Sequence, residues 1–140
     1  MAAALVEMAA QFGDLPVDPG LRARALELAE EELHAYAPVL EAQRAGDPAR
    51  VAEALSRAAE SPLAIARLAA QVAEAGAGVM AGGKESVKGD AAVGVVLAEA
   101  ACRAAGRLVR INLASLPGDP RLAELADLEA RAASSLTSSK

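Results

Sequence analysis

The stretch that decides the fold runs from Asp90 to Asn112 and reads DAAVGVVLAEAACRAAGRLVRIN. Alanine, leucine and valine fill it, and no proline interrupts it. We therefore predict a long helix over about residues 91–116, with Asp90 as its N-terminal cap and Pro117-Gly118 as its stop. At 1.5 Å per residue it would be roughly 40 Å long. Its mostly apolar surface predicts a central, buried position.

Helical spacing of apolar residues continues on both sides, and no stretch alternates as a strand would. Further helices are expected over about residues 2–12, 19–45, 48–60, 61–80 and 120–136. The apolar face of the second is expected to comprise Leu21, Ala25, Leu28, Ala29, Leu33, Tyr36 and Leu40. Residues 81–89 (AGGKESVKG) are expected to form a flexible loop. The sequence thus predicts one all-α domain over residues 1–140, an antiparallel bundle of about five to six helices around the long helix.

The core is predicted to be thin, because the apolar content is mostly alanine. Apolar residues make up 54% of the chain, but Phe12 and Tyr36 are its only aromatic residues. Burial contributes roughly 25 cal/mol per Å² of apolar surface, so small side chains stabilise little individually. We therefore expect a homodimer or a larger homo-oligomer.

Composition also argues against several classes of protein. The net charge of -5 argues against a nucleic-acid partner. Cys102 is the only cysteine, which excludes an internal disulfide and favours a cytoplasmic location. The apolar start carries Glu7 and no leading basic residue, so we do not expect a signal peptide. The longest apolar run is too short to span a membrane, and one His with one Cys cannot form a zinc site.

A basic stripe lies on the predicted long helix. Glu99, Arg103, Arg107 and Arg110 are spaced by four, four and three residues, which places them on one face. One interpretation is a solvent-facing edge in which Glu99 and Arg103 form an ordinary pair. The other is a groove for an anionic ligand that carries carboxylates.

Other polar groups have similar alternatives. Asp90 is either only a helix cap, or a carboxylate that orients a substrate or accepts a proton. Asn112 is an amide in an apolar run, and it needs a hydrogen-bond partner on another helix or on a ligand. The acidic run Glu30–Glu32 is expected to be a solvated face, with His34 paired to Glu30 or Glu31.

The stretch from Asp90 to Asn112, with LVRINL at residues 108–113, resembles the cyclodeaminase / methenyltetrahydrofolate cyclohydrolase family. That family includes the C-terminal domain of formiminotransferase-cyclodeaminase and small bacterial relatives, and it ends this helix with Asn-Val-x-Ile-Asn-Leu. Residues 32–36 (ELHAY) are similar to its Asp-x-x-Ala-Tyr motif. Arg50 with residues 61–64 (SPLA) is similar to its Arg…Ala-x-x-x-Pro-Leu segment, and residues 1–12 to part of its first helix.

Three differences accompany the resemblance. Glu32 stands where the family usually has Asp, and Leu108 stands where it has Asn. The family's Gly-Gly-Gly-Ser segment precedes the equivalent of Met1, and the sequence as given lacks it. An anion could be held by the backbone amides of such a segment.

The resemblance implies a dimeric helical protein that acts on a tetrahydrofolate derivative. It implies either ring closure of 5-formiminotetrahydrofolate with loss of ammonia, or interconversion of 5,10-methenyl- and 10-formyltetrahydrofolate. It implies Asp90 and Glu32 as catalytic residues and Asn112, Arg110, Arg107 and Lys84 as substrate-binding residues. Neither a metal nor a cofactor is implied besides the folate itself. The alternative is a non-catalytic relative that binds a folate or a partner helix.

Overall fold

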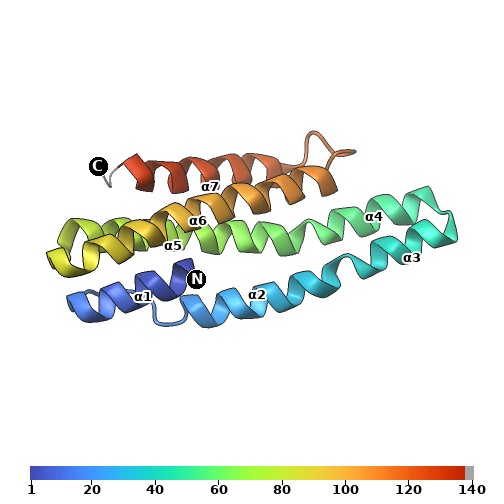
Figure 1. The fold of residues 1–140 in the computed structure, drawn as a ribbon. Coiled ribbons are helices and arrows are strands. Elements are labelled where there is room, and N and C mark those ends of the chain that lie inside the picture. The colour runs from blue at the N-terminus through green and yellow to red at the C-terminus, as the bar shows by residue number, and fades with distance from the viewer. Residues whose placement is uncertain (138–140) are drawn as a thin grey trace.

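The computed structural model describes residues 1–137, and these form seven helices and no strand. The helices are α1 (Ala2–Gly13), α2 (Leu21–Ala35), α3 (Ala37–Ala45), α4 (Pro48–Ala58), α5 (Glu60–Gly82), α6 (Glu85–Asn112) and α7 (Pro120–Thr137). Tyr36 joins α2 to α3 and Ala59 joins α4 to α5, so the helices make five rods (Figure 1). The predicted all-α bundle is therefore confirmed.

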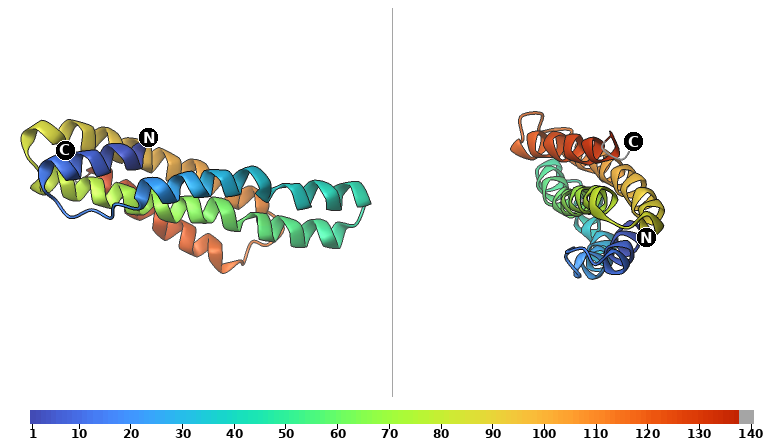
Figure 2. Two further views of the ribbon diagram at one scale, coloured as in Figure 1. Left: turned by 90° about the horizontal axis from the view of Figure 1, so that it is seen from below. Right: turned by 90° about the vertical axis from the view of Figure 1, so that its left-hand side faces the viewer.

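The helices α5 and α6 form the centre of the bundle. Seen end-on, α7 covers one side of this pair and α1 with α2 covers the other (Figure 2). Glycines let three helices approach closely, since a Cβ at Gly76 of α5 would lie 2.6 Å from Cγ2 of Val95. A Cβ at Gly94 of α6 would lie 2.7 Å from Cγ2 of Val6 in α1. The long α6 is thus held against both α1 and α5.

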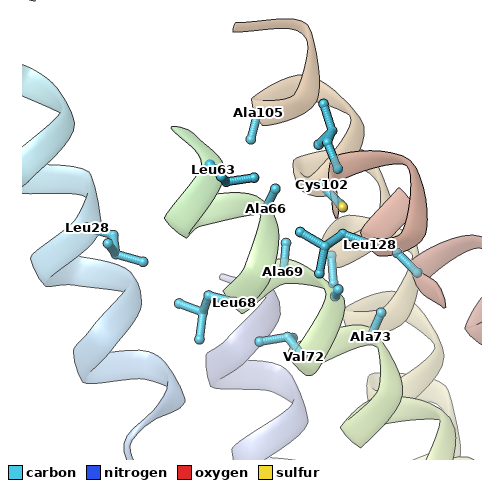
Figure 3. Packing of buried hydrophobic residues seen from close by; sticks show 14 of the residues in the cluster. Leu28, Leu63, Ala66, Leu68, Ala69, Val72, Ala73, Cys102, Ala105 and Leu128 are labelled. Atoms are coloured by element: carbon cyan, nitrogen blue, oxygen red, sulfur yellow. The ribbon is translucent and has the colours of Figure 1, made fainter. Parts of the chain in front are cut away.

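The main core lies between α2, α5, α6 and α7 (Figure 3). Its members include Leu28, Leu63, Ala66, Ala69, Cys102, Ala105 and Leu128. The α4–α5 rod is long and apolar enough to cross a membrane by length and composition alone. However, Leu63, Ala66, Ala70 and Ala73 of that rod are fully buried inside the protein. The apolar composition of this rod is therefore explained by its burial in the core.

The start of α6 differs from the expectation. The helix begins at Glu85 and its N-cap is Lys84, so Asp90 is not its cap and residues 85–89 are helical. The expected loop over residues 81–89 shrinks to Gly83 and Lys84. A glycine inside a helix lowers the stability of the helix by only about 1 kcal/mol relative to alanine. Burial of Val87 in a cluster with Ala9, Ala10, Val79 and Ala91 offsets that cost.

The buried face of the second rod also differs from the expectation. Leu21 and Leu28 are buried, but Leu33 is 79% exposed, and Tyr36 and Leu40 are also exposed. The rod turns at Tyr36, and α3 then buries Val39 and Ala42 against Ala54 and Ala58 of α4. This α3–α4 hairpin extends beyond the end of the bundle (Figure 2). Leu33 was therefore wrongly predicted as core.

The loop between α6 and α7 is fastened to the α4–α5 junction by one arginine. The guanidinium of Arg121 donates to Asp119 Oδ2 at 2.7 Å, to Glu60 Oε1 at 2.7 Å and to the Ser56 carbonyl at 2.7 Å. Its hydrogen bonds to Asp119 lower the pKa of that carboxyl from 3.8 to about 2. The carboxylate therefore stabilises the folded state most strongly when it is charged.

Replacing Arg121 with methionine is expected to destabilise the protein at pH 7, and the difference from wild type should shrink in acid. The stabilisation that accompanies the lowered pKa of Asp119 is fully present above pH 3.8, the ordinary pKa of this carboxyl. It is lost as the pH falls towards about 2. Urea unfolding midpoints at pH 7, 5, 3 and 2 measure this. Arg44→Met is the control, because Arg44 is exposed and forms no ion pair in residues 1–137. A difference that stays constant down to pH 2 would contradict this account.

Candidate functional site

Five of the six predicted site residues belong to α6 or its N-cap, and the fold of the chain does not bring them together. Asp90 and Asn112 are 22 positions apart along α6, or about 33 Å at 1.5 Å per residue. Lys84 lies near Asp90, whereas Arg107 and Arg110 lie near Asn112. Glu32 is on α2. The chain thus separates the proposed proton acceptor from most of the proposed binding residues.

Asp90 and Lys84 have different environments at the start of α6. The Asp90 side chain is exposed and forms neither a hydrogen bond nor an ion pair within the described chain. Lys84 pairs with Asp14 at 3.1 Å and approaches the carbonyl of Phe12 at 3.4 Å. Lys84 therefore ties the α5–α6 loop to the end of α1, and only Asp90 is free to meet a ligand.

A groove of about 610 Å³ lies between α6 and α7. The predicted basic stripe lines it on the α6 side, so the stripe's four residues do share one face. The full lining is Glu99, Ala100, Arg103, Ala104, Arg107, Arg110, Glu129 and Ala133. The lining therefore combines three guanidinium groups with two carboxylates.

The three arginines of the groove are not equivalent. Arg110 donates two hydrogen bonds to Glu129 of α7, at 2.8 and 2.6 Å, and this contact lowers the pKa of Glu129. Gly106 permits the contact, because a Cβ there would overlap Glu129. Arg103 forms the predicted pair with Glu99, at 3.5 Å. Arg107 has no ion-pair partner among residues 1–137, so it is the groove's available cation.

Asn112 and Glu32 form no side-chain hydrogen bond in the described chain, but a fully buried unpaired oxygen is found on Glu32 and not on Asn112. The Asn112 side chain is 8% exposed and forms no hydrogen bond in the described part of the chain, so the predicted bond to another helix is absent. Oε2 of Glu32 is buried without a partner, and so is Oγ of Ser61 on α5. Leaving such groups unpaired costs about 1–3 kcal/mol each. Buried polar groups of this kind point to a ligand or a partner chain.

An apolar groove of about 350 Å³ lies between α1, α2, α5 and α6. It is lined by Met1, Ala2, Ala3, Ala25, Leu28, Ala29, Ile65, Leu68, Ala69, Val72, Leu97, Ala98 and Ala101. Leu28 and Ile65 both line it, so Glu32 and Ser61, one turn further along their helices, lie at its end. The sequence did not predict this groove, because its walls come from four separate helices.

The remaining candidates are occupied or isolated. Glu31 pairs with Arg24 at 3.2 Å, and His34 forms no ion pair within residues 1–137, so the predicted pair between them is wrong. Burial raises the pKa of the Cys102 thiol to about 11, which keeps it protonated. In the described chain no three His, Cys, Asp or Glu side chains are grouped to hold a metal ion.

Comparison with known proteins identifies a matching family and a similar solved structure. The model of the formiminotransferase-cyclodeaminase family matches residues 16–132. The fold is similar to the crystal structure of formiminotetrahydrofolate cyclodeaminase from Thermotoga maritima, with a TM-score of 0.87 and 22% sequence identity. That comparison covers 100% of this chain and 80% of the Thermotoga chain. None of the curated proteins compared with this chain matches it.

Proposed function

Because the chain belongs to the formiminotransferase-cyclodeaminase family, we propose that it binds a tetrahydrofolate derivative and acts in folate one-carbon metabolism. The family match over residues 16–132 is the observation that carries this proposal. The free thiol of Cys102 fits a cytoplasmic location, which is part of the same proposal.

The proposed reaction is cyclodeamination of 5-formiminotetrahydrofolate. N10 attacks the formimino carbon and loses its proton, the bond from that carbon to the imino nitrogen breaks, and the nitrogen gains protons and leaves as ammonia. The product is 5,10-methenyltetrahydrofolate. The reaction needs a proton acceptor near N10, and the free carboxylate of Asp90 is our choice for it. Hydration of the methenyl carbon, the cyclohydrolase reaction, needs the same kind of acceptor.

The α6–α7 groove is proposed to hold the glutamate tail of the folate. Arginine forks bind carboxylates with two parallel hydrogen bonds. Arg107 is available for such a contact, whereas Arg110 is already bound to Glu129. The structure therefore changes the expectation from the sequence, in which Arg107 and Arg110 had equal roles. A tail carboxylate would bind Arg107 first, and Glu129 would hold Arg110 in place.

Replacing Arg107 with alanine is expected to weaken binding of a polyglutamylated folate more than binding of a monoglutamate. The loss should grow as the salt concentration falls, because the groove is open to solvent and salt screens its charge. Titration calorimetry with both ligands, at low and at physiological salt, measures the difference. Arg50→Ala is the control, since Arg50 is exposed on α4, outside the groove. Equal losses for the two ligands would contradict a tail site at Arg107.

The test of the proposed function is the absorbance of methenyltetrahydrofolate. The protein is supplied with formimino- and formyl-substituted tetrahydrofolates in turn, and the appearance of the product is followed. A second candidate is a folate-binding protein without turnover, which is favoured by Leu108 at the position where the related family has Asn. Binding without turnover would select that candidate. Failure to bind any of these folates would contradict both.

A further inference from the structure

A row of exposed apolar side chains runs along the outer side of the second rod, from α2 into α3. Leu26, Leu33 and Leu40 are 65%, 79% and 43% exposed, and Tyr36 is 43% exposed. The three leucines are seven residues apart, and the exposed Ala29 and Tyr36 each follow a leucine by three residues. This spacing keeps all five side chains on one face of a helix, and we call them the α2–α3 stripe.

The junction between α2 and α3 does not interrupt the stripe. Tyr36 has right-handed helical φ and ψ of -90° and -12°, and its carbonyl accepts hydrogen bonds from the amides of Val39 and Leu40. The core lies on the other side of the rod, where Leu28 is buried against α5 and Val39 against α4. The rod therefore has a second apolar face, which residues 1–137 leave exposed at the outer edge of the bundle (Figure 1).

The period of the stripe indicates what kind of element packs on it. Apolar residues at the first and fourth positions of a seven-residue repeat form the narrow seam by which one helix packs along another. The three leucines of the stripe take the first position, and Ala29 and Tyr36 take the fourth. From the first leucine to the last, the seam is about 21 Å long at 1.5 Å per residue. Arg22 and Arg44 lie four residues beyond its two ends, so the seam matches a helix with about two apolar heptads.

The edges of the stripe are acidic. Glu30 and Glu32 lie on either side of Leu33, at the flanking positions whose charges select the partner of such a seam. Glu41 lies further along the same edge as Glu30. None of these three carboxylates forms an ion pair among residues 1–137, and the nearby Arg24 is already paired with two other glutamates of α2. Both edges of the stripe therefore carry uncompensated negative charge.

We propose that the α2–α3 stripe binds a basic amphipathic helix of another protein. That helix packs its apolar face on the leucines and pairs lysine or arginine side chains with the glutamates at the edges. Charge decides between this occupant and others. A second copy of the chain would bring further acidic edges to the stripe, and helices that bind anionic membranes carry basic residues beside their apolar face. A helix with lysine or arginine at its flanking positions instead places opposite charges along both edges.

Helical probe peptides test the charge complementarity. A synthetic peptide of about three heptads carries leucine at the first and fourth positions of each heptad and lysine at the flanking positions, and its matched counterpart carries glutamate there. Fluorescence anisotropy of the labelled peptides measures their binding to the intact protein. The lysine peptide should bind at least about tenfold more tightly, and its affinity should fall as the salt concentration rises. Failure of the lysine peptide to bind would overturn the inference, and so would equal binding of the two peptides.

A substitution at the centre of the stripe tests where the lysine peptide binds. Leu33→Gln should weaken its binding at least about tenfold, because the peptide then loses the apolar surface of the central leucine without any change of charge. Phe12→Gln is the matched control, since Phe12 is 67% exposed but belongs to α1. Both variants should keep the helical circular dichroism signal of the wild type. A Leu33→Gln protein that binds the peptide as tightly as the wild type would place the peptide elsewhere and overturn the inference.

Charge reversal and solution mass test the choice of occupant. The double variant Glu30→Lys, Glu41→Lys should bind the lysine peptide more weakly than the wild type does, and the glutamate peptide more tightly, because one edge of the stripe is then basic. Unchanged affinities for both peptides would contradict the proposed role of these edges. Light scattering should give Leu33→Gln the same mass as the wild type. A lower mass for the variant would show that a second copy of the chain covers the stripe, and it would overturn the inference.

Discussion

The Asp90→Asn variant is expected to lose turnover of 5-formiminotetrahydrofolate by roughly 100-fold or more, the usual contribution of a general base. Asparagine keeps the size and shape of the side chain but cannot accept the proton that N10 loses. Asp90 is exposed and does not cap α6, so the substitution should leave the fold intact. The measurement is the rate of methenyltetrahydrofolate formation, together with the helical circular dichroism signal.

The control for this prediction is Asp127→Asn. Asp127 is an exposed carboxylate on α7, outside both grooves, and its replacement should leave the rate unchanged. An Asp90→Asn variant that turns over at the wild-type rate would remove Asp90 from the reaction. Asp90 would then have neither a catalytic nor a capping role, because α6 begins at Glu85, five residues before it.

Truncating Leu63 to alanine is expected to lower the free energy of unfolding by about 2–5 kcal/mol, the range for buried leucines. Leu63 is fully buried in the main core between α2, α5 and α6. Alanines such as Ala66 and Ala105 share that core, and they have few atoms that could move into the space. Urea unfolding at a fixed protein concentration measures the change.

Leu33→Ala provides the matched control. The sequence predicted Leu33 as part of the apolar face of the second helix, but it is 79% exposed. Its truncation should change the free energy of unfolding by less than about 0.5 kcal/mol, as at most surface sites. A loss at Leu33 comparable to that at Leu63 would mean that the outer face of α2 is covered in solution.

Much of the local structure was predictable because it depends on neighbouring residues in the chain. The helix expected from about residue 48 does begin at Pro48, where Asp47 caps it and its carboxylate accepts hydrogen bonds from the amides of Ala49 and Arg50. Gly46 adopts a positive φ of 68° directly before it. The start of α6 was missed, because packing of Val87 between α1 and α5 keeps the helix intact through Gly89. No local pattern contains that contact.

The candidate site likewise has features that the sequence predicted and features that only the structure shows. Helical spacing alone determined that Arg103, Arg107 and Arg110 share one face and that Glu99 pairs with Arg103. The tertiary structure decided that Arg110 is bound by Glu129 of α7, for whose carboxylate Gly106 leaves room, and that Arg107 has no ion-pair partner among residues 1–137.

The sequence by itself determined the all-α class and most of the helix boundaries, because propensity, capping and the 3.6-residue period act over one or two turns. Only the tertiary structure decided which leucines of the second rod are buried, since α3 turns to pack on α4. The long helix predicted over residues 91–116 already placed Asp90 far from Asn112, and the structure keeps α6 unbroken over 28 residues. Contacts between helices depend on residues distant in sequence, and helical periodicity carries no information about them.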